Sequence, residues 1–218
     1  MAQPYIERIL NAQVYDVARE TPLDPAPLLS ARLGNHALLK REDLQPVFSF
    51  KCRGAYNKMI HLDEASRAAG VVAASAGNHA QGVALAASKL GIKAKIVMPV
   101  TTPLIKVEAV RALGAKVVLS GDSFDEAAVR AAALVEAEGL TFIHPFDDPD
   151  VIAGQATVAV ELVRQASRPL DYVFVCCGGG GLLAGMATYL RYVWPQTKII
   201  GVEPEDAACV QAALHKGR

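Results

Sequence analysis

The chain has 218 residues, and its 22 lysine and arginine residues balance 22 aspartate and glutamate residues, so its formal net charge is zero. Because 52% of the residues are apolar and only 20% are charged, the chain can bury a core, which excludes intrinsic disorder. A neutral chain lacks the positive field that attracts phosphate backbones or anionic lipids, so we expect no nucleic acid and no membrane as partner.

Taken in chain order, helically spaced apolar residues from Ile6 to Val17 predict an opening amphipathic helix. From residue 70 onward, apolar runs predict strands at residues 71–74, 95–98, 116–119, 142–143, 172–175 and 198–201. Between and after them, helices are predicted at residues 80–90, 103–113, 124–138, 151–165, 182–193 and 206–214. Helix ends are marked by Gly91, Gly114 and Gly139, and a start by Asp122 or Ser123.

A strand followed by a helix every 22 to 30 residues or so is typical of βαβ units, so the predicted fold class is α/β with parallel sheets. The uncharged stretch 172–190 is long enough for a membrane span, but four glycines in its middle favour a strand, a glycine turn and a helix. The first residues mix charges with apolar residues, so no signal peptide is predicted. Four cysteines without a C-x-x-C pair favour a reducing, cytoplasmic location.

The loops after strands are where chemistry is expected in such folds. One of them contains Gly178, Gly179, Gly180 and Gly181, directly before a predicted helix. Backbone N–H groups of such a loop can converge on a phosphate, although a tight turn is the simpler explanation. The spacing of Gly179, Gly181 and Ala184, with Glu203 after the next strand, also fits a dinucleotide site, so a nicotinamide-binding Rossmann protein is an alternative.

Two further loops carry reactive side chains. Lys51, preceded by Phe50, begins a predicted helix, where the helix dipole and an apolar neighbour would lower the pKa of its amine, as a nucleophile requires. An ordinary surface lysine is the alternative. Ser75 and Asn78 lie between a strand and a helix, where they can cap the helix and also bind a carboxylate.

Together, the segments Ser49 to Ala55, Ser75 to Gly82 and Gly178 to Leu182 resemble the pyridoxal-phosphate enzymes of the tryptophan-synthase β group, and within it the threonine dehydratases. The resemblance implies a two-lobed α/β fold with open parallel sheets flanked by helices. Residues 51–149 would form the smaller lobe, and residues 1–50 and 150–218 part of the larger, cofactor-binding lobe. His144 to Pro149 is the expected crossing between them.

The resemblance also implies roles for individual residues. Lys51 would form the Schiff base with pyridoxal 5′-phosphate and then take the Cα proton of the substrate. Phe50 would lie against the cofactor ring, and Asn78 would bind its 3′-hydroxyl. Gly178, Gly179, Gly180, Gly181 and Leu182 would hold its phosphate. Ser75, Asn78 and His79 would receive the carboxylate of the amino-acid substrate.

The implied function is deamination of L-threonine to 2-oxobutanoate and ammonia, a step of isoleucine biosynthesis, by a homo-oligomer. Ala76 stands where similar serine racemases carry a second base, which favours elimination, and Cys209 replaces an acid of the cation site of some relatives, so no metal is expected. Family members continue past residue 218, so we expect the rest of the larger lobe and any regulatory domain to be absent. A serine dehydratase and a non-catalytic fragment are the remaining alternatives.

Overall fold

A computed structural model describes residues 2–217. One lobe is built on a parallel four-stranded sheet in the order β5-β4-β3-β6. Its strands are β3 (Val71–Ala74), β4 (Ala94–Met98), β5 (Lys116–Leu119) and β6 (Thr141–Phe142). Helices on both faces bury the central strands, which explains why β3 and β4 read as continuous apolar runs and not as alternating patterns.

The two faces of this sheet have separate cores. Val71, Ala73 and Ile96 pack with α3 (Lys51–Ile60), α5 (Asn78–Leu90) and α6 (Leu104–Ala112). Val72 and Ala74 point the other way and pack on α7 (Phe124–Glu138). A short helix, α4 (Glu64–Ala69), precedes β3 and contains no buried residue. Alternating side-chain direction along each strand therefore produces two cores from one apolar run.

The other lobe contains the parallel pair β7 (Tyr172–Cys176) and β8 (Lys198–Val202). Val173 and Val175 face α8 (Pro149–Gln165) and α9 (Gly181–Val193), whereas Tyr172 and Phe174 on the opposite face are exposed. The helix α1 (Ala2–Leu10) packs on α8 and α9. After β8 the chain forms η2 (Glu205–Ala207) and α10 (Cys209–Lys216).

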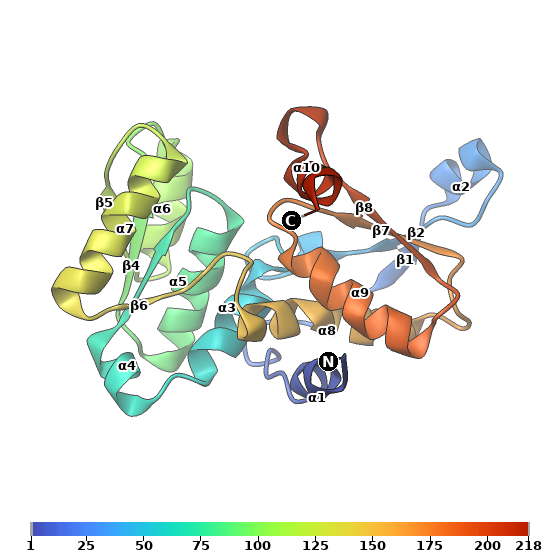
Figure 1. The fold of residues 1–218 in the computed structure, drawn as a ribbon, viewed down its shortest axis with the longest axis horizontal. Coiled ribbons are helices and arrows are strands. Elements are labelled where there is room, and N and C mark those ends of the chain that lie inside the picture. Colours follow the sequence, from blue (N-terminus) through green and yellow to red (C-terminus); the bar gives the residue numbers. More distant parts are fainter. Residues whose placement is uncertain (1, 218) are drawn as a thin grey trace.

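An antiparallel pair, β1 (Leu23–Pro25) and β2 (Leu38–Lys40), encloses α2 (Pro27–Leu33), and η1 (Glu42–Leu44) follows. Figure 1 shows α2 at the end of the molecule farthest from the four-stranded sheet. It has no buried residue, and its Leu28 is 88% exposed.

Helices α3 and α8 join the two lobes at the centre of the molecule (Figure 1). They approach closely at Gly54 and Gly154, where a Cβ atom on Gly154 would lie 2.7 Å from the Cα of Gly54. On its other side α3 contacts α5 at Gly82. The approach is so close that a Cβ atom on Gly82 would lie 2.9 Å from the carbonyl oxygen of Lys51. Glycines therefore let the helix that begins with Lys51 pack tightly between two neighbours.

The predicted α/β class and all six predicted strands are confirmed. Stretch 172–190 is β7, a glycine turn and α9, and no helix within residues 2–217 is long and apolar enough to cross a membrane. Three predictions need correction: the opening helix ends at Leu10, residues 206–214 fall into η2 and α10, and α5 is capped by Gly77 with no side-chain bond from Ser75 or Asn78.

Candidate active site

The amine of Lys51 is placed by the start of α3. Phe50 is the N-cap residue and supplies no side-chain cap, while the hydroxyl of Ser49 accepts the backbone N–H of Lys51 at 3.3 Å. The Nζ atom of Lys51 donates a hydrogen bond to the carbonyl oxygen of Pro145 at 2.5 Å, and it lies 5.6 Å from the centroid of the Phe50 ring. The loop between β6 and α8 therefore holds the end of this lysine.

Burial lowers the pKa of Lys51, and the neighbouring Cys176 thiol opposes that shift only in part. A lysine with a lowered pKa has a larger fraction of neutral amine at neutral pH, and the neutral amine is the nucleophilic form. The pKa of Lys51 is thus lowered as the sequence predicted, and the main cause is removal of the amine from water.

The glycine loop connects the end of β7 to the start of α9. Gly180 has φ of +88°, a conformation that other residues rarely adopt. A Cβ atom on Gly179 would lie 2.2 Å from the Phe146 ring, and one on Gly181 would lie 2.7 Å from the Phe146 carbonyl oxygen. The loop is thus a strip of bare backbone at a helix N-terminus, which suits a phosphate group.

Lys51 and this loop line one cavity of about 270 Å3. The same cavity is lined by Phe50 and Leu182, so the residues expected to hold the cofactor ring and phosphate come together, with the exception of Asn78. Its walls also include residues for which the sequence suggested no part in the site: Phe146, Cys176, Cys177, Val202 and Pro204. Of these, Phe146 could have been suspected, since it belongs to the expected crossing between the lobes.

Ser75, Asn78 and His79 do not line this cavity. They lie where β3 leads into α5, and the hydroxyl of Ser75 accepts the backbone N–H of Gly77 at 3.2 Å. Because Gly82 of the same helix contacts Lys51, the loop stays beside the helix that bears the amine. The first backbone N–H groups of α5 remain available to an anion, as at any helix start.

The side chain of His79 is buried and unsuited to bind a carboxylate. Its Nε2 lies 2.9 Å from the carbonyl oxygen of Ile143, and burial lowers its pKa to about 3, so the ring is neutral at physiological pH. With Nε2–H donating to Ile143, Nδ1 is an acceptor, and it has no hydrogen-bond partner among the described residues. Only the backbone N–H of His79 can donate to a carboxylate.

Glu203 has a structural role that speaks against a dinucleotide site. Its two carboxylate oxygens accept the backbone N–H groups of Val210 and Gln211, each at 2.9 Å, and these bonds hold its pKa below the usual value. The carboxylate therefore caps α10 and is not free to bind a ribose. The nicotinamide alternative required this carboxylate to bind a ribose, so the structure does not support it.

A larger groove, about 1150 Å3, runs along β8 between α9 and α10. Leu183, Val210 and Leu214 contribute apolar side chains, and Lys51 and Phe50 are not among its lining residues. The smaller cavity is therefore the candidate active site, because it, unlike the groove, brings the Lys51 amine next to a loop that can bind a phosphate.

Comparison with known proteins agrees with this geometry. The family model described as "Pyridoxal-phosphate dependent enzyme" matches residues 14–218. The chain is 61% identical over 216 residues to the biosynthetic, chloroplastic threonine dehydratase of Arabidopsis thaliana, covering 99% of this chain and 36% of that protein.

Two solved structures are also similar. The processed form of threonine deaminase isoform 2 from Solanum lycopersicum has a TM-score of 0.96 and 55% identity, over 100% of this chain and 63% of that one. Maize serine racemase has a TM-score of 0.93 and 34% identity, and the match covers 98% of this chain and 65% of that one. The chain thus spans about a third of the Arabidopsis relative and less than two thirds of either structure. By sequence and by fold, this chain belongs to the pyridoxal-phosphate dependent enzyme family.

Proposed function

We propose that this chain carries the cofactor-anchoring part of a pyridoxal-phosphate-dependent threonine dehydratase, which converts L-threonine to 2-oxobutanoate and ammonia. The observation that carries the proposal is the shared cavity of Lys51 and the Gly178–Gly181 loop. Family membership supports the cofactor, and the names of the relatives from Arabidopsis and Solanum support threonine as the substrate.

The residues present fit pyridoxal phosphate. Its phosphate requires several backbone donors without side chains in the way, and a Cβ atom on Gly178 would meet nothing within 4 Å, so that side of the loop is open. Its aldehyde requires a neutral amine, which the burial of Lys51 favours. Phe50 adds an aromatic surface to the same cavity.

Each residue then has a defined task. The glycine loop and the N-terminus of α9 would hold the phosphate, and the Pro145 carbonyl orients the Nζ of Lys51. The Nζ of Lys51 would take the Cα proton of the substrate. When bound, pyridoxal phosphate withdraws electrons from that carbon, which eases loss of the proton and of the β-hydroxyl. Elimination removes one water from threonine and the later hydrolysis adds one back, so each threonine yields one 2-oxobutanoate and one ammonia.

Substrate binding is assigned to the α5 loop. Ser75, Asn78 and the backbone N–H of His79 would receive the substrate carboxylate, and Asn78 would also contact the cofactor's 3′-hydroxyl. Ala76 has no side chain that could act as a second base, which favours elimination over the racemisation named for the maize neighbour. Serine is the competing substrate, since one methyl group changes binding by only about 1–3 kcal/mol.

The proposal extends to organisation and location. Residues 51–149 would form the smaller lobe, and residues 1–50 and 150–218 part of the larger one, which is supported by the separate sheets of the two regions. The core of β7, α8 and α9 is separate from that of the four-stranded sheet, although Val14, Val17 and Val47 of the first segment pack into the latter. We further propose a homo-oligomer in the cytoplasm, and the isoleucine pathway as the metabolic setting.

Borohydride reduction in the presence of pyridoxal phosphate tests the anchor. We expect peptide mapping to find a pyridoxyl group on Lys51, and Lys51→Arg to abolish that label. The matched control is Lys58→Arg, because Lys58 lies on the same helix but pairs with Asp148 at 2.8 Å. A label spread evenly over surface lysines would overturn the assignment. Release of 2-oxobutanoate from threonine, compared with pyruvate from serine, then tests the reaction and its preference.

A further inference from the structure

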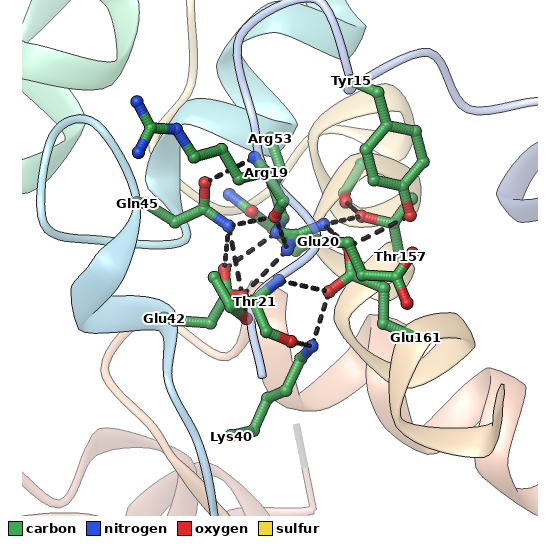
Figure 2. A network of polar contacts seen from close by, with 12 residues as sticks. Tyr15, Arg19, Glu20, Thr21, Lys40, Glu42, Gln45, Arg53, Thr157 and Glu161 are labelled. Atoms are coloured by element: carbon green, nitrogen blue, oxygen red, sulfur yellow. Dashed lines mark hydrogen bonds and ion pairs between the residues drawn. The ribbon is translucent and has the colours of Figure 1, made fainter. Parts of the chain in front are cut away.

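A buried cluster of charges lies behind the helix that begins with Lys51 (Figure 2). Arg53 and Glu161 are both 0% exposed and form an ion pair at 2.6 Å. Glu42 from η1 and Lys40 from β2 complete a set of two positive and two negative side chains. Two of these charges are fully buried and the side chains of Lys40 and Glu42 are only 11% and 13% exposed, so the four are mutually paired, because an unpaired buried charge would be very costly.

The guanidinium of Arg53 uses all five of its N–H donors. Nε and Nη2 bind the two carboxylate oxygens of Glu42, each at 2.8 Å, in a bidentate arrangement. Nη1 donates to Glu161 at 2.6 Å and to Thr157 at 3.1 Å, and Nη2 also donates to the Arg19 carbonyl at 3.1 Å. Arg53 is therefore fixed in one orientation.

The two carboxylates are anchored in turn by other segments. Glu161 accepts hydrogen bonds from Lys40 at 2.5 Å and from the Tyr15 hydroxyl at 3.0 Å. Glu42 accepts one from the Thr21 hydroxyl at 2.6 Å. Figure 2 shows the N-terminal segment, the Lys40–Gln45 region, α3 and α8 meeting at this point. Arg53 thus ties α3 to three other parts of the chain.

This connection matters because the N-cap residue Phe50 supplies no side-chain cap, and the Ser49 hydroxyl holds the Lys51 N–H only at 3.3 Å. Residues two apart on a helix point to nearly opposite sides, so Arg53 faces away from the direction of Lys51. The cluster therefore holds the turn from the side opposite the cavity, while Gly82 of α5 contacts the Lys51 backbone. The position of the Lys51 backbone depends on both contacts.

We propose that Arg53 is a positioning residue: its bonds to Glu42 and Glu161 set the orientation of the first turn of α3 and thereby the place of the Lys51 amine. The proposal rests on the proposed function in taking Lys51 as the reactive amine. Arg53 does not touch the cavity, and its effect on chemistry is exerted through the helix. Displacement of a reacting group by about 1 Å can cost a hundredfold in rate, so a small tilt of this turn has a measurable effect.

The test measures the reactivity of Lys51 in Arg53→Lys and Glu42→Gln by two reagents. Lysine at position 53 cannot reproduce the bidentate pairing. Glu42→Gln disturbs Arg53 more mildly and serves as the folded variant if Arg53→Lys does not fold. Pyridoxal phosphate with borohydride reports the cofactor reaction, and limiting acetic anhydride reports the amine alone. The exposed Lys116 serves as internal reference in the peptide map.

Tyr15→Phe is the matched control. It removes one hydrogen bond from Glu161 and none from α3, so we expect it to lower stability without moving Lys51. We expect both labels on Lys51 to fall by about tenfold in the Arg53 and Glu42 variants, with Lys116 and the Tyr15 variant unchanged.

Equal labelling of Lys51 in folded wild type, Arg53→Lys and Glu42→Gln would overturn the positioning role. An equal loss in Tyr15→Phe would do the same, because stability alone would then account for the effect. If wild-type Lys51 reacts with acetic anhydride but not with pyridoxal phosphate, the proposed function fails. A drop in acetylation in the two variants would still support positioning in that case.

Discussion

Adding a single methyl group at Gly179 tests the close packing that shapes the glycine loop. Its Cβ atom would lie 2.2 Å from Cδ1, 2.3 Å from Cγ and 2.4 Å from Cε1 of Phe146. Carbon atoms in contact are separated by about 3.5–4.0 Å, so the ring would have to move by more than about 1 Å. That ring cannot swing away easily, because it packs edge-on against His144 at 4.7 Å and its backbone adjoins Gly181.

Overpacking of this kind costs about 1–3 kcal/mol, and the reduced freedom of the unfolded chain returns about 0.4–1 kcal/mol. We therefore expect Gly179→Ala to lower the free energy of unfolding by about 1–2 kcal/mol. Gly178→Ala is the matched control, since its Cβ atom would meet nothing within 4 Å and its φ is not positive. Its stability should stay within about 0.5 kcal/mol of wild type.

Urea unfolding can be followed by the fluorescence of Trp194, the only tryptophan, which lies in the core beneath β7. If the Phe146 ring is the obstacle, Phe146→Ala should relieve the strain. The double variant should then be more stable than the sum of the two single losses predicts, by at least about 1 kcal/mol. Strictly additive losses would refute the packing argument.

Three other predictions concern stability. Glu161→Gln breaks a buried pair with Arg53 and should cost about 3–5 kcal/mol in urea unfolding at pH 7. Burial alone would raise the pKa of Glu161, but the hydrogen bonds from Arg53 hold it below the usual value. The stabilisation by the Glu161 carboxylate is therefore complete above its unfolded pKa of about 4.3 and is lost as pH falls through its folded pKa. The Glu161→Gln variant lacks this carboxylate and should lose less stability on acidification than wild type. Burial lowers the pKa of His79 to about 3. The stability gained by keeping this ring neutral is therefore complete above the unfolded pKa of about 6.5, and it declines as pH falls below that value. His79→Gln should flatten that part of the pH profile, and an NMR titration of His79 near pH 6.5 would contradict the assignment. Ser123→Ala removes the N-cap bond to the backbone N–H of Glu126 and should lower the unfolding free energy by about 1 kcal/mol; an unchanged urea midpoint would show that this cap is not stabilising.

Local patterns were sufficient for most of the regular structure. Strands β3 and β4 are short apolar runs buried on both faces, and such runs are distinctive in sequence. Gly91 and Gly139 end their helices with φ of +66°, and Ser123 caps α7, because these are local requirements of a helix end. The elements missed are short: β1 and β2 have three residues each and are defined mainly by pairing with each other.

Apolar periodicity also misled at the N-terminus. Val14 and Val17 are buried and continue the spacing of α1, yet the helix ends at Leu10 and both side chains join the core from a loop. Burial alone therefore does not establish a helix, since a loop can also deliver apolar side chains to a core.

For the site, the amino-acid sequence determined which residues we propose for the chemistry: an amine at the start of a helix, and a loop of four glycines after a strand. Tertiary structure decided how these residues are arranged. It joined Lys51 to the glycine loop through a cavity, turned the His79 side chain toward Ile143, and used Glu203 to cap α10. It also brought Lys40, Arg53 and Glu161 together, although more than a hundred positions separate Glu161 from each of the other two. Such contacts depend on the relative placement of whole helices, which results from packing of the entire chain and leaves no local pattern in the sequence.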